Sequence, residues 1–213
     1  MRRLNIKLTL WLIGIVVISV VGVHFLHGYQ LGRNADFLRV QAETARESGN
    51  AREAMKQYNQ YLKHRDDPAG YSALAEIVLE IAKDKDATRP DKMRAYNILE
   101  EAIRRHPDLD EVRRSLIDYT IQARRFGDAL EHIQYLTDKG KKDPELELKI
   151  ALCHFHTGEE EKSLKQLCEL LGYDMQTGGF VAEAPPGAKE LAAFELLSQV
   201  LRSKTMALPR PTK

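Results

Sequence analysis

Two kinds of stabilising feature are almost missing from this sequence: cysteine pairs and strand-forming runs. Only two of the 213 residues are cysteines, so a framework of disulfide bonds is excluded. Strand-forming residues are not concentrated anywhere after the N-terminal segment, and the Asn-Gly pair that often joins two strands is missing. Leucine, alanine, glutamate, lysine and arginine dominate instead, as is typical of helices with solvated outer faces. The sequence therefore predicts an all-α fold.

An excess of charge of one sign is also missing. The chain carries 32 lysine and arginine residues against 31 aspartate and glutamate residues. Three basic residues, Arg2, Arg3 and Lys7, precede an uncharged stretch, and the rest of the chain keeps 29 basic and 31 acidic residues. A nucleic-acid-binding domain normally shows a basic excess. We therefore expect no nucleic-acid partner.

The third absence is that of catalytic motifs. The sequence contains no phosphate-binding loop, no dinucleotide-binding glycine pattern, no nucleophile elbow and no His-Glu-x-x-His motif. Three consecutive glutamates at 159–161 lie at an expected helix start, where the helix dipole favours negative charge. We therefore expect that the protein is not an enzyme and binds neither a cofactor nor a small-molecule substrate.

One cluster suggests a different function, which is metal binding. Cys153 and His156 are three positions apart, so one face of a helix could present both to a metal ion. A closed zinc site needs four ligands, and Cys168 or His132 would have to complete it. The apolar period instead makes Cys153 a core residue. The two cysteines could also form one disulfide bond, or remain two small buried side chains.

The longest uncharged run lies near the start of the chain. Residues 8–27 contain no lysine, arginine, aspartate or glutamate, and about 20 apolar residues can cross a bilayer as a helix. Trp11 lies near one end of the run and Phe25 and Tyr29 near the other, where aromatic rings favour the membrane interface. A signal peptide has a shorter apolar region and an Ala-x-Ala-like cleavage site, which this run lacks. We therefore predict an uncleaved transmembrane anchor over residues 8–27.

The basic segment 1–7 predicts the orientation of this anchor. Positively charged flanks stay on the cytoplasmic side of a membrane. The N-terminus is therefore expected in the cytoplasm, and the body of the protein on the extracytoplasmic side, which is the periplasm in a Gram-negative-type bacterium. In a eukaryotic cell the same run could instead be an organelle anchor with the body in the cytosol.

A triplet of one small and two large residues recurs four times in the rest of the chain. The second and third members follow the first by four and seven positions, so all three share one helix face. The first members, at positions 54, 95, 129 and 163, are 41, 34 and 34 residues apart, and a polar insertion around 83–90 explains the longer interval. A period of 34 is typical of helical-hairpin repeats. The triplets are Ala54/Tyr58/Tyr61, Ala95/Leu99/Ala102, Ala129/Ile133/Leu136 and Ser163/Leu167/Leu170.

Turn and boundary residues complete the pattern. Gly49 and Gly158 each precede a small residue by five positions, and Pro68, Pro107 and Pro144 mark repeat boundaries. With these residues, the sequence over 35–177 resembles the tetratricopeptide repeat (TPR) family. The resemblance implies an α-solenoid of about four helical hairpins over residues 33–177. It also implies that the first helix of each hairpin lines a concave groove that binds a partner peptide.

The groove that this resemblance implies is mostly charged at its start and apolar at its end. The apolar patch could hold a side chain of a partner, or it could pack against a later helix of the same chain. The predicted groove residues are Arg39, Glu43, Arg46, Glu76, Glu80, Arg114, Asp118, Leu148, Leu152 and Phe155.

The repeat pattern ends before residue 178, and a segment rich in glycine and proline follows it. Residues 178–187 contain paired glycines and paired prolines and are predicted to form a loop. Residues 188–203 are predicted to form one amphipathic helix, which either caps the array or docks onto a second copy of the chain. The tail 204–213 is expected to be disordered.

Together these features predict a single-pass membrane protein that holds a partner protein in the groove of its repeats. Two alternatives remain open at this stage. One is a structural membrane protein that assembles with itself, and the other is a metal-binding protein that uses Cys153 and His156.

Overall fold

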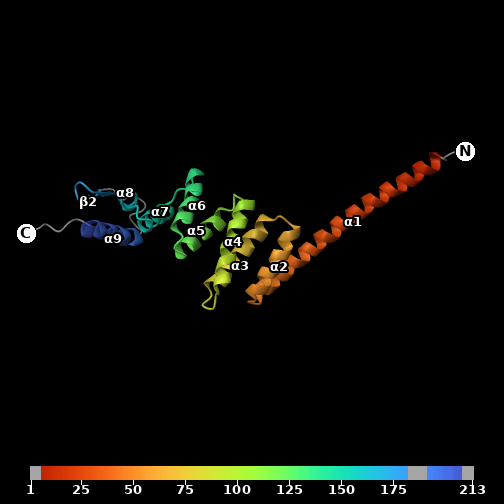
Figure 1. The fold of residues 1–213 in the computed structure, drawn as a ribbon, viewed down its shortest axis with the longest axis horizontal. Helices are drawn as coiled ribbons and strands as arrows, with labels where there is room; N and C mark the ends of the chain where they lie inside the picture. Colours follow the sequence, from red (N-terminus) through yellow and green to blue (C-terminus); the bar gives the residue numbers. More distant parts are fainter. Residues whose placement is uncertain (1–5, 182–190, 208–213) are drawn as a thin grey trace, which may run out of the picture. The chain divides into compact units, whose positions relative to one another are not determined.

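A computed structural model describes the backbone over residues 6–181 and 191–207, and the side chains over 11–24, 33–181 and 191–203. Within these ranges the elements follow one another as in Figure 1. They are α1 (Ile6–Glu47), α2 (Ala51–His64), α3 (Pro68–Lys83), α4 (Arg89–Arg105), α5 (Asp110–Gln122), α6 (Phe126–Asp138), α7 (Pro144–His156), α8 (Glu160–Leu171), β1 (Tyr173–Asp174), β2 (Gly179–Phe180) and α9 (Leu191–Ala207).

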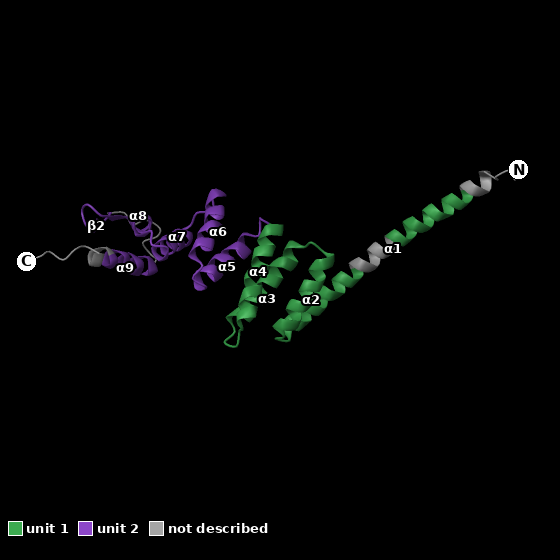
Figure 2. Cartoon of the chain, in the orientation of Figure 1, with its two compact units in different colours: residues 1–106 green, residues 107–213 purple. Residues whose placement is uncertain are grey.

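The chain divides into two compact units, residues 1–106 and 107–213 (Figure 2). Unit 1 holds α1 to α4, and unit 2 holds α5 to α9. Consecutive helices pack as hairpins, α1 with α2 and α3 with α4 in unit 1, and α5 with α6 and α7 with α8 in unit 2. The predicted all-α class and the helical hairpins are therefore confirmed, with one short pair of strands in addition.

The four triplets form the interior of these hairpins. Their small members, Ala54, Ala95, Ala129 and Ser163, have no exposed surface, and their other members are at most 4% exposed. A small residue is needed at the first position because two helix backbones approach closely there. In unit 2 the third triplet shares one apolar cluster with Cys153, as the apolar period predicted.

Three of the four hairpins use the same turn between their helices. A residue with positive φ ends the first helix, at Gly49 (76°), Arg124 (58°) and Gly158 (81°). The next N–H then donates to the carbonyl five positions earlier, over 2.8 Å in each turn. This is the Schellman motif, which satisfies carbonyls that a helix end leaves free. The glycines were predicted, whereas Arg124 takes the glycine position in the third hairpin.

Acidic side chains start the helices at the repeat boundaries. The Asp67 carboxylate accepts hydrogen bonds from the Ala69 and Gly70 N–H groups of α3, and the Asp143 carboxylate accepts one from the Leu146 N–H of α7. In the second hairpin the polar insertion ends at Thr88, which forms a capping box with Asp91 at the start of α4. Prolines lie in the first turn of all three helices, where a missing N–H costs nothing.

Unit 2 ends with a short hairpin of strands and a helix. Tyr173 pairs with Phe180 and Asp174 with Gly179 in antiparallel register. This hairpin is a correction to the predicted loop at 178–187. Asp174 explains it, because its carboxylate accepts hydrogen bonds from the Gln176 N–H and the Thr177 hydroxyl across the turn. The rest of that loop, 182–187, lies outside the described residues.

The terminal helix α9 packs on α8. Its buried apolar side chains join those of α7 and α8 in one cluster, so its apolar face is covered by its own chain. This contact favours the capping role over docking onto a second copy. The helix extends to Ala207, past the predicted end at 203, because no glycine or proline interrupts the chain before Pro209. Its predicted start at 188–190 and the tail 208–213 lie outside the described residues.

The N-terminal segment is part of one long helix. Residues 8–27 and the first helix of the repeats, predicted as separate segments, both belong to α1, which runs from Ile6 to Glu47. Among the residues that the structure describes, no helix is both long enough and apolar enough to cross a membrane. Residues 1–5 lie outside the described residues, and the side chains at 8–10 and 25–27 of the predicted anchor are not described either.

Candidate functional site

The charged part of the predicted groove lies on first helices of both units, and most of its side chains pair with one another. On α1, the Arg39 guanidinium lies 3.0 Å from the Glu43 carboxylate. Further along the same helix, Arg46 lies 2.6 Å from Glu76 of α3. This second pair connects the first helices of two neighbouring hairpins. All four side chains are more than 40% exposed, so they remain open to a ligand.

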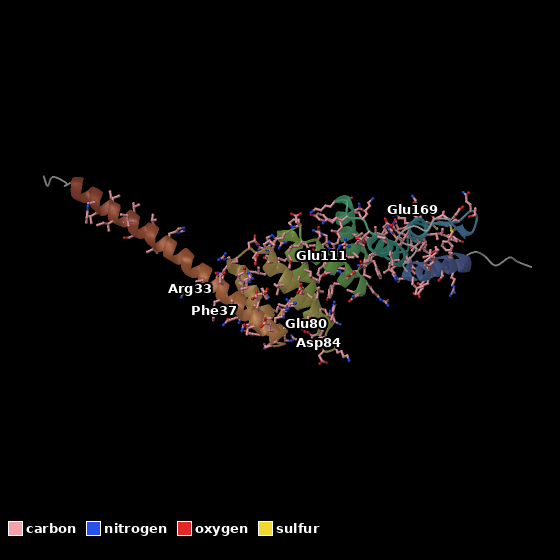
Figure 3. The ribbon with its side chains drawn as sticks, turned by 180° about the vertical axis from the view of Figure 1, so that it is seen from behind. Arg33, Phe37, Glu80, Asp84, Glu111 and Glu169 are labelled. Atoms are coloured by element: carbon pink, nitrogen blue, oxygen red, sulfur yellow. The ribbon has the colours of Figure 1, made fainter. Side chains whose placement is uncertain are left out.

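Glu80 differs from the other acidic residues of unit 1. It lies one turn after Glu76 on α3, near Asp84 at the end of the helix (Figure 3). Its side chain is exposed, and no cation pairs with it among the residues that the structure describes. Glu80 is therefore a carboxylate that a partner can reach without displacing an internal ion pair.

In unit 2 the predicted residue Arg114 serves the structure of its own unit. Its guanidinium, on α5, lies 2.7 Å from the Asp143 carboxylate, which also caps α7. Burial alone would raise the pKa of Asp143, but the Leu146 N–H and the Arg114 guanidinium outweigh it and lower the pKa. The same hydrogen bond raises the pKa of Arg114. Arg114 therefore positions α7 against α5.

A second ion pair in unit 2 includes a residue that the sequence prediction missed. Lys149 of α7 pairs with Asp118 of α5 and with Glu145 of its own helix. The Lys149 side chain is only 16% exposed, and burial opposes its charge, yet the carboxylates of Asp118 and Glu145 keep its pKa raised. The sequence does contain a signal for the pair of Lys149 with Asp118. Like Arg46 and Glu76, Asp118 and Lys149 are opposite charges about 30 positions apart, close to one repeat.

The apolar end of the predicted groove is partly covered. Leu148, Leu152 and Phe155 are half-buried and pack against the cluster that α7 and α8 share with α9. Phe155 also contacts the His156 ring, which stacks on Phe126 with 4.4 Å between the ring centroids. The patch therefore packs against a later helix, as one of the two alternatives predicted. Because α9 covers part of it, less of its apolar surface is available to a partner.

The metal-site hypothesis finds no geometric support. No group of three or more histidine, cysteine, aspartate or glutamate side chains could hold a metal ion within the described part of the chain. Cys153 lies in the apolar core, and burial raises the pKa of its thiol to about 11. His156 is stacked on Phe126, outside that core. Both cysteines are free thiols, so the disulfide alternative is wrong; of the two side chains predicted to be buried, Cys153 is buried and Cys168 only partly so.

Solved structures that resemble this chain are repeat proteins. YrrB, described as a TPR protein with an unusual peptide-binding site, superposes with a TM-score of 0.56 at 13% identity, over 80% of this chain and 77% of that chain. MamA (41-end) from Desulfovibrio magneticus RS-1 gives a TM-score of 0.52 at 13% identity, over 83% and 98%. No family model matches the sequence. No curated protein matches it either. The chain therefore has a TPR-like fold.

Proposed function

We propose that this protein is a membrane-anchored scaffold that binds a partner polypeptide along the first helices of its repeats. One observation carries the proposal. In unit 1 the charged groove side chains of these helices remain exposed, and the pair Arg46–Glu76 aligns them between neighbouring hairpins. A face that served only packing would be apolar and covered. The TPR-like fold supports the same function by analogy of architecture alone.

The charges of unit 1 favour a basic partner segment. Its predicted groove residues are two arginines and three glutamates, and Glu80 has no ion pair among the described residues. A lysine or arginine of the partner would therefore find an available carboxylate at Glu80. Complementary charge of this kind contributes mainly to specificity and to the association rate.

Crosslinking in intact membranes tests the groove. A tagged full chain should capture a small, reproducible set of proteins, and Glu80→Lys should reduce their yield at least fivefold. Glu131→Lys is the matched control, because Glu131 is equally exposed but lies on α6, a second helix. Equal yields for Glu80→Lys and the parent chain would refute the groove assignment. Arg114 is unsuitable for this test, because its loss would also disturb α7.

The anchor is a second part of the same proposal. The run 8–27 is uncharged, and the large apolar side chains of α1 between Trp11 and Val23 are 42–73% exposed. Apolar side chains exposed all round a helix are unfavourable in water, whereas lipid would cover them. Because positively charged flanks favour the cytoplasmic side, the basic segment 1–7 supports an orientation with the repeats on the extracytoplasmic side.

Membrane extraction tests the anchor separately. The full chain should stay with membranes through an alkaline carbonate wash, and Val17→Arg combined with Val20→Arg should release it. A parent chain that is washed off would exclude the anchor. A C-terminal tag that resists protease in spheroplasts would exclude the proposed orientation.

A further inference from the structure

Unit 1 contains a cleft on the side of α3 that faces away from the predicted groove. The cleft has a volume of about 250 Å³ and lies between α2, α3 and α4; its lining residues include Leu62, Tyr71, Leu74 and Ile98. Tyr71 and Leu74 lie roughly 180° around α3 from Glu76 and Glu80, at 100° per residue. A ligand in this cleft therefore leaves the groove free.

The chemistry of the cleft is divided between its floor and its rim. The floor is apolar, and the rim carries Lys63, Glu101 and Arg105. Glu101 is already neutralised, because Arg105 lies 2.9 Å and Arg104 3.8 Å from its carboxylate. Lys63 is exposed and has no acidic partner among the described side chains of the unit. The rim is therefore net positive and can accept a carboxylate.

Tyr71 supplies a hydroxyl that a ligand in the cleft can reach. Its side chain lines the cleft and is only 6% exposed, and it lies beside the His106 ring. The Tyr71 hydroxyl makes no hydrogen bond within the part of the chain that the structure describes, and it is not one of the buried polar atoms without a partner, so it is open to solvent at the cleft. Burial raises the pKa of Tyr71, Arg105 lowers it, and Glu101 and Asp66 raise it further. A ligand oxygen would satisfy this donor.

The size of the cleft limits what can occupy it. Small-molecule and cofactor sites usually have volumes of about 300–1,000 Å³. A cleft of 250 Å³ is smaller and suits one large apolar side chain. We propose that the cleft is a second docking site, which binds a partner segment in which a leucine-sized side chain lies next to an aspartate or glutamate. The apolar side chain fills the floor, and its neighbouring carboxylate contacts Lys63 and the Tyr71 hydroxyl.

A labelled peptide provides a direct test with the full chain in detergent micelles. The probe is Gly-Ser-Asp-Leu-Asp-Ser-Gly, and binding is followed by fluorescence polarisation. We expect saturable binding that a peptide with lysine in place of both aspartates, or with alanine in place of leucine, does not show. Equal binding of the three peptides, or no binding of the first at millimolar concentration, would overturn the proposal.

Three variants of the protein locate the bound probe. Lys63→Glu should weaken binding at least tenfold, and Tyr71→Phe about fivefold, since phenylalanine keeps the packing but lacks the hydroxyl. Lys85→Glu is the matched charge reversal, because Lys85 lies beyond the far end of α3, and it should have no effect. Unchanged binding by Lys63→Glu and Tyr71→Phe would contradict the assigned contacts.

The groove proposal is tested separately from the cleft. Glu80→Lys should leave binding of the probe unchanged, and its loss in that variant would place the probe in the groove and refute the cleft. A Lys63→Glu variant that shifts the oligomeric state in sedimentation would identify a second copy as the occupant and also refute the proposal. Failure of the membrane crosslinking test would not affect either outcome.

Discussion

At the scale of single residues, Ser163 is the one member of the four small positions that is not alanine. Its hydroxyl is fully buried and has no hydrogen-bond partner among the described residues. A buried hydroxyl without a partner keeps its desolvation cost. We expect Ser163→Ala to raise the free energy of unfolding by about 1 kcal/mol in urea titrations.

The reciprocal change is the control for Ser163. Ala129 occupies the same position in the third hairpin and is also fully buried. Ala129→Ser should lower the free energy of unfolding by about 1–3 kcal/mol. Stability that falls in Ser163→Ala would mean that the hydroxyl has a partner after all.

Arg124 is the second residue with a measurable cost. Its φ of 58° lies in the left-handed region, which costs a residue with a Cβ roughly 1–2 kcal/mol. Glycine avoids that cost but loses more chain entropy on folding. We expect Arg124→Gly to stabilise the protein by about 0.5–1 kcal/mol in the same titrations. Gln122→Gly, within α5, should instead destabilise it by about 1 kcal/mol, and a loss of stability in both variants would contradict this account.

The residue scale also shows how far the sequence could predict the fold. The four triplets were predictable because each needs only helical spacing, and all are buried. Arg124 was not predictable as a turn residue from its own type, since arginine favours helices. Only its position, five residues before Ala129, indicated it. Lys149 was missed because it lies between apolar neighbours, and its partner Asp118 lies one repeat earlier in the chain.

At the scale of elements, one ion pair joins the second helices of unit 1. Arg52 of α2 donates to both carboxylate oxygens of Asp91 in α4, over 3.0 and 3.1 Å. The Arg52 guanidinium and the hydroxyl and N–H of Thr88 hold the pKa of Asp91 well below its usual range. A carboxyl whose pKa is lower in the folded than in the unfolded chain stabilises the folded state. This contribution is fully present above the unfolded pKa of about 3.9, and it is lost as the pH falls from there towards the folded pKa.

The effect of removing the Asp91 charge should therefore depend on pH. Asp91→Asn should lower the urea midpoint at pH 7 more than at pH 3, where the parent chain has already lost part of the contribution. Asp86→Asn serves as the control, because Asp86 is exposed and has no ion pair in the described structure. A difference between Asp91→Asn and the parent chain that stays constant from pH 7 to pH 3 would contradict the role given to the charge.

The terminal helix α9 allows a second test at this scale. Leu197 is 5% exposed and lies in the cluster that α9 shares with α8, whereas Leu191 of the same helix is 72% exposed. We expect Leu197→Ala to cost about 2–4 kcal/mol and Leu191→Ala less than about 0.5 kcal/mol. Denaturation followed by circular dichroism measures both. Similar costs for the two variants would mean that α9 is not held by this face.

The element scale separates what sequence patterns predict from what they do not. The helices α2 to α8 followed from apolar spacing, glycines and prolines, whereas the fusion of the N-terminal run with the first repeat helix in α1 and the end of α9 at Ala207 did not. The strands at 173–180 were missed because two-residue strands leave no period to detect, and only the turn chemistry of Asp174 marks them. The cleft lined by Tyr71 was missed because no single helix defines it. It depends on how α2, α3 and α4 pack.

At the scale of the whole molecule, stability should be local. In a repeat protein each hairpin contacts chiefly its neighbours, so damage to one part spreads little. Leu99 in unit 1 and Leu167 in unit 2 are both fully buried. We expect Leu99→Ala to speed amide hydrogen exchange in α3 and α4 and to leave α7 and α8 unchanged, with the reverse pattern for Leu167→Ala. Faster exchange throughout the chain in either variant would show that the molecule unfolds as one cooperative body.

The shared turn of the hairpins has a consequence for the evolution of the repeat array. Arg124 and Gly158 end their helices with the same backbone geometry, and they lie 34 residues apart. Excision of residues 125–158 from the gene would join Arg124 to Glu159 and recreate that turn at the junction. Duplication of the same segment would do so as well. The array can therefore gain or lose a whole hairpin in a single recombination event, without having to evolve a new connection.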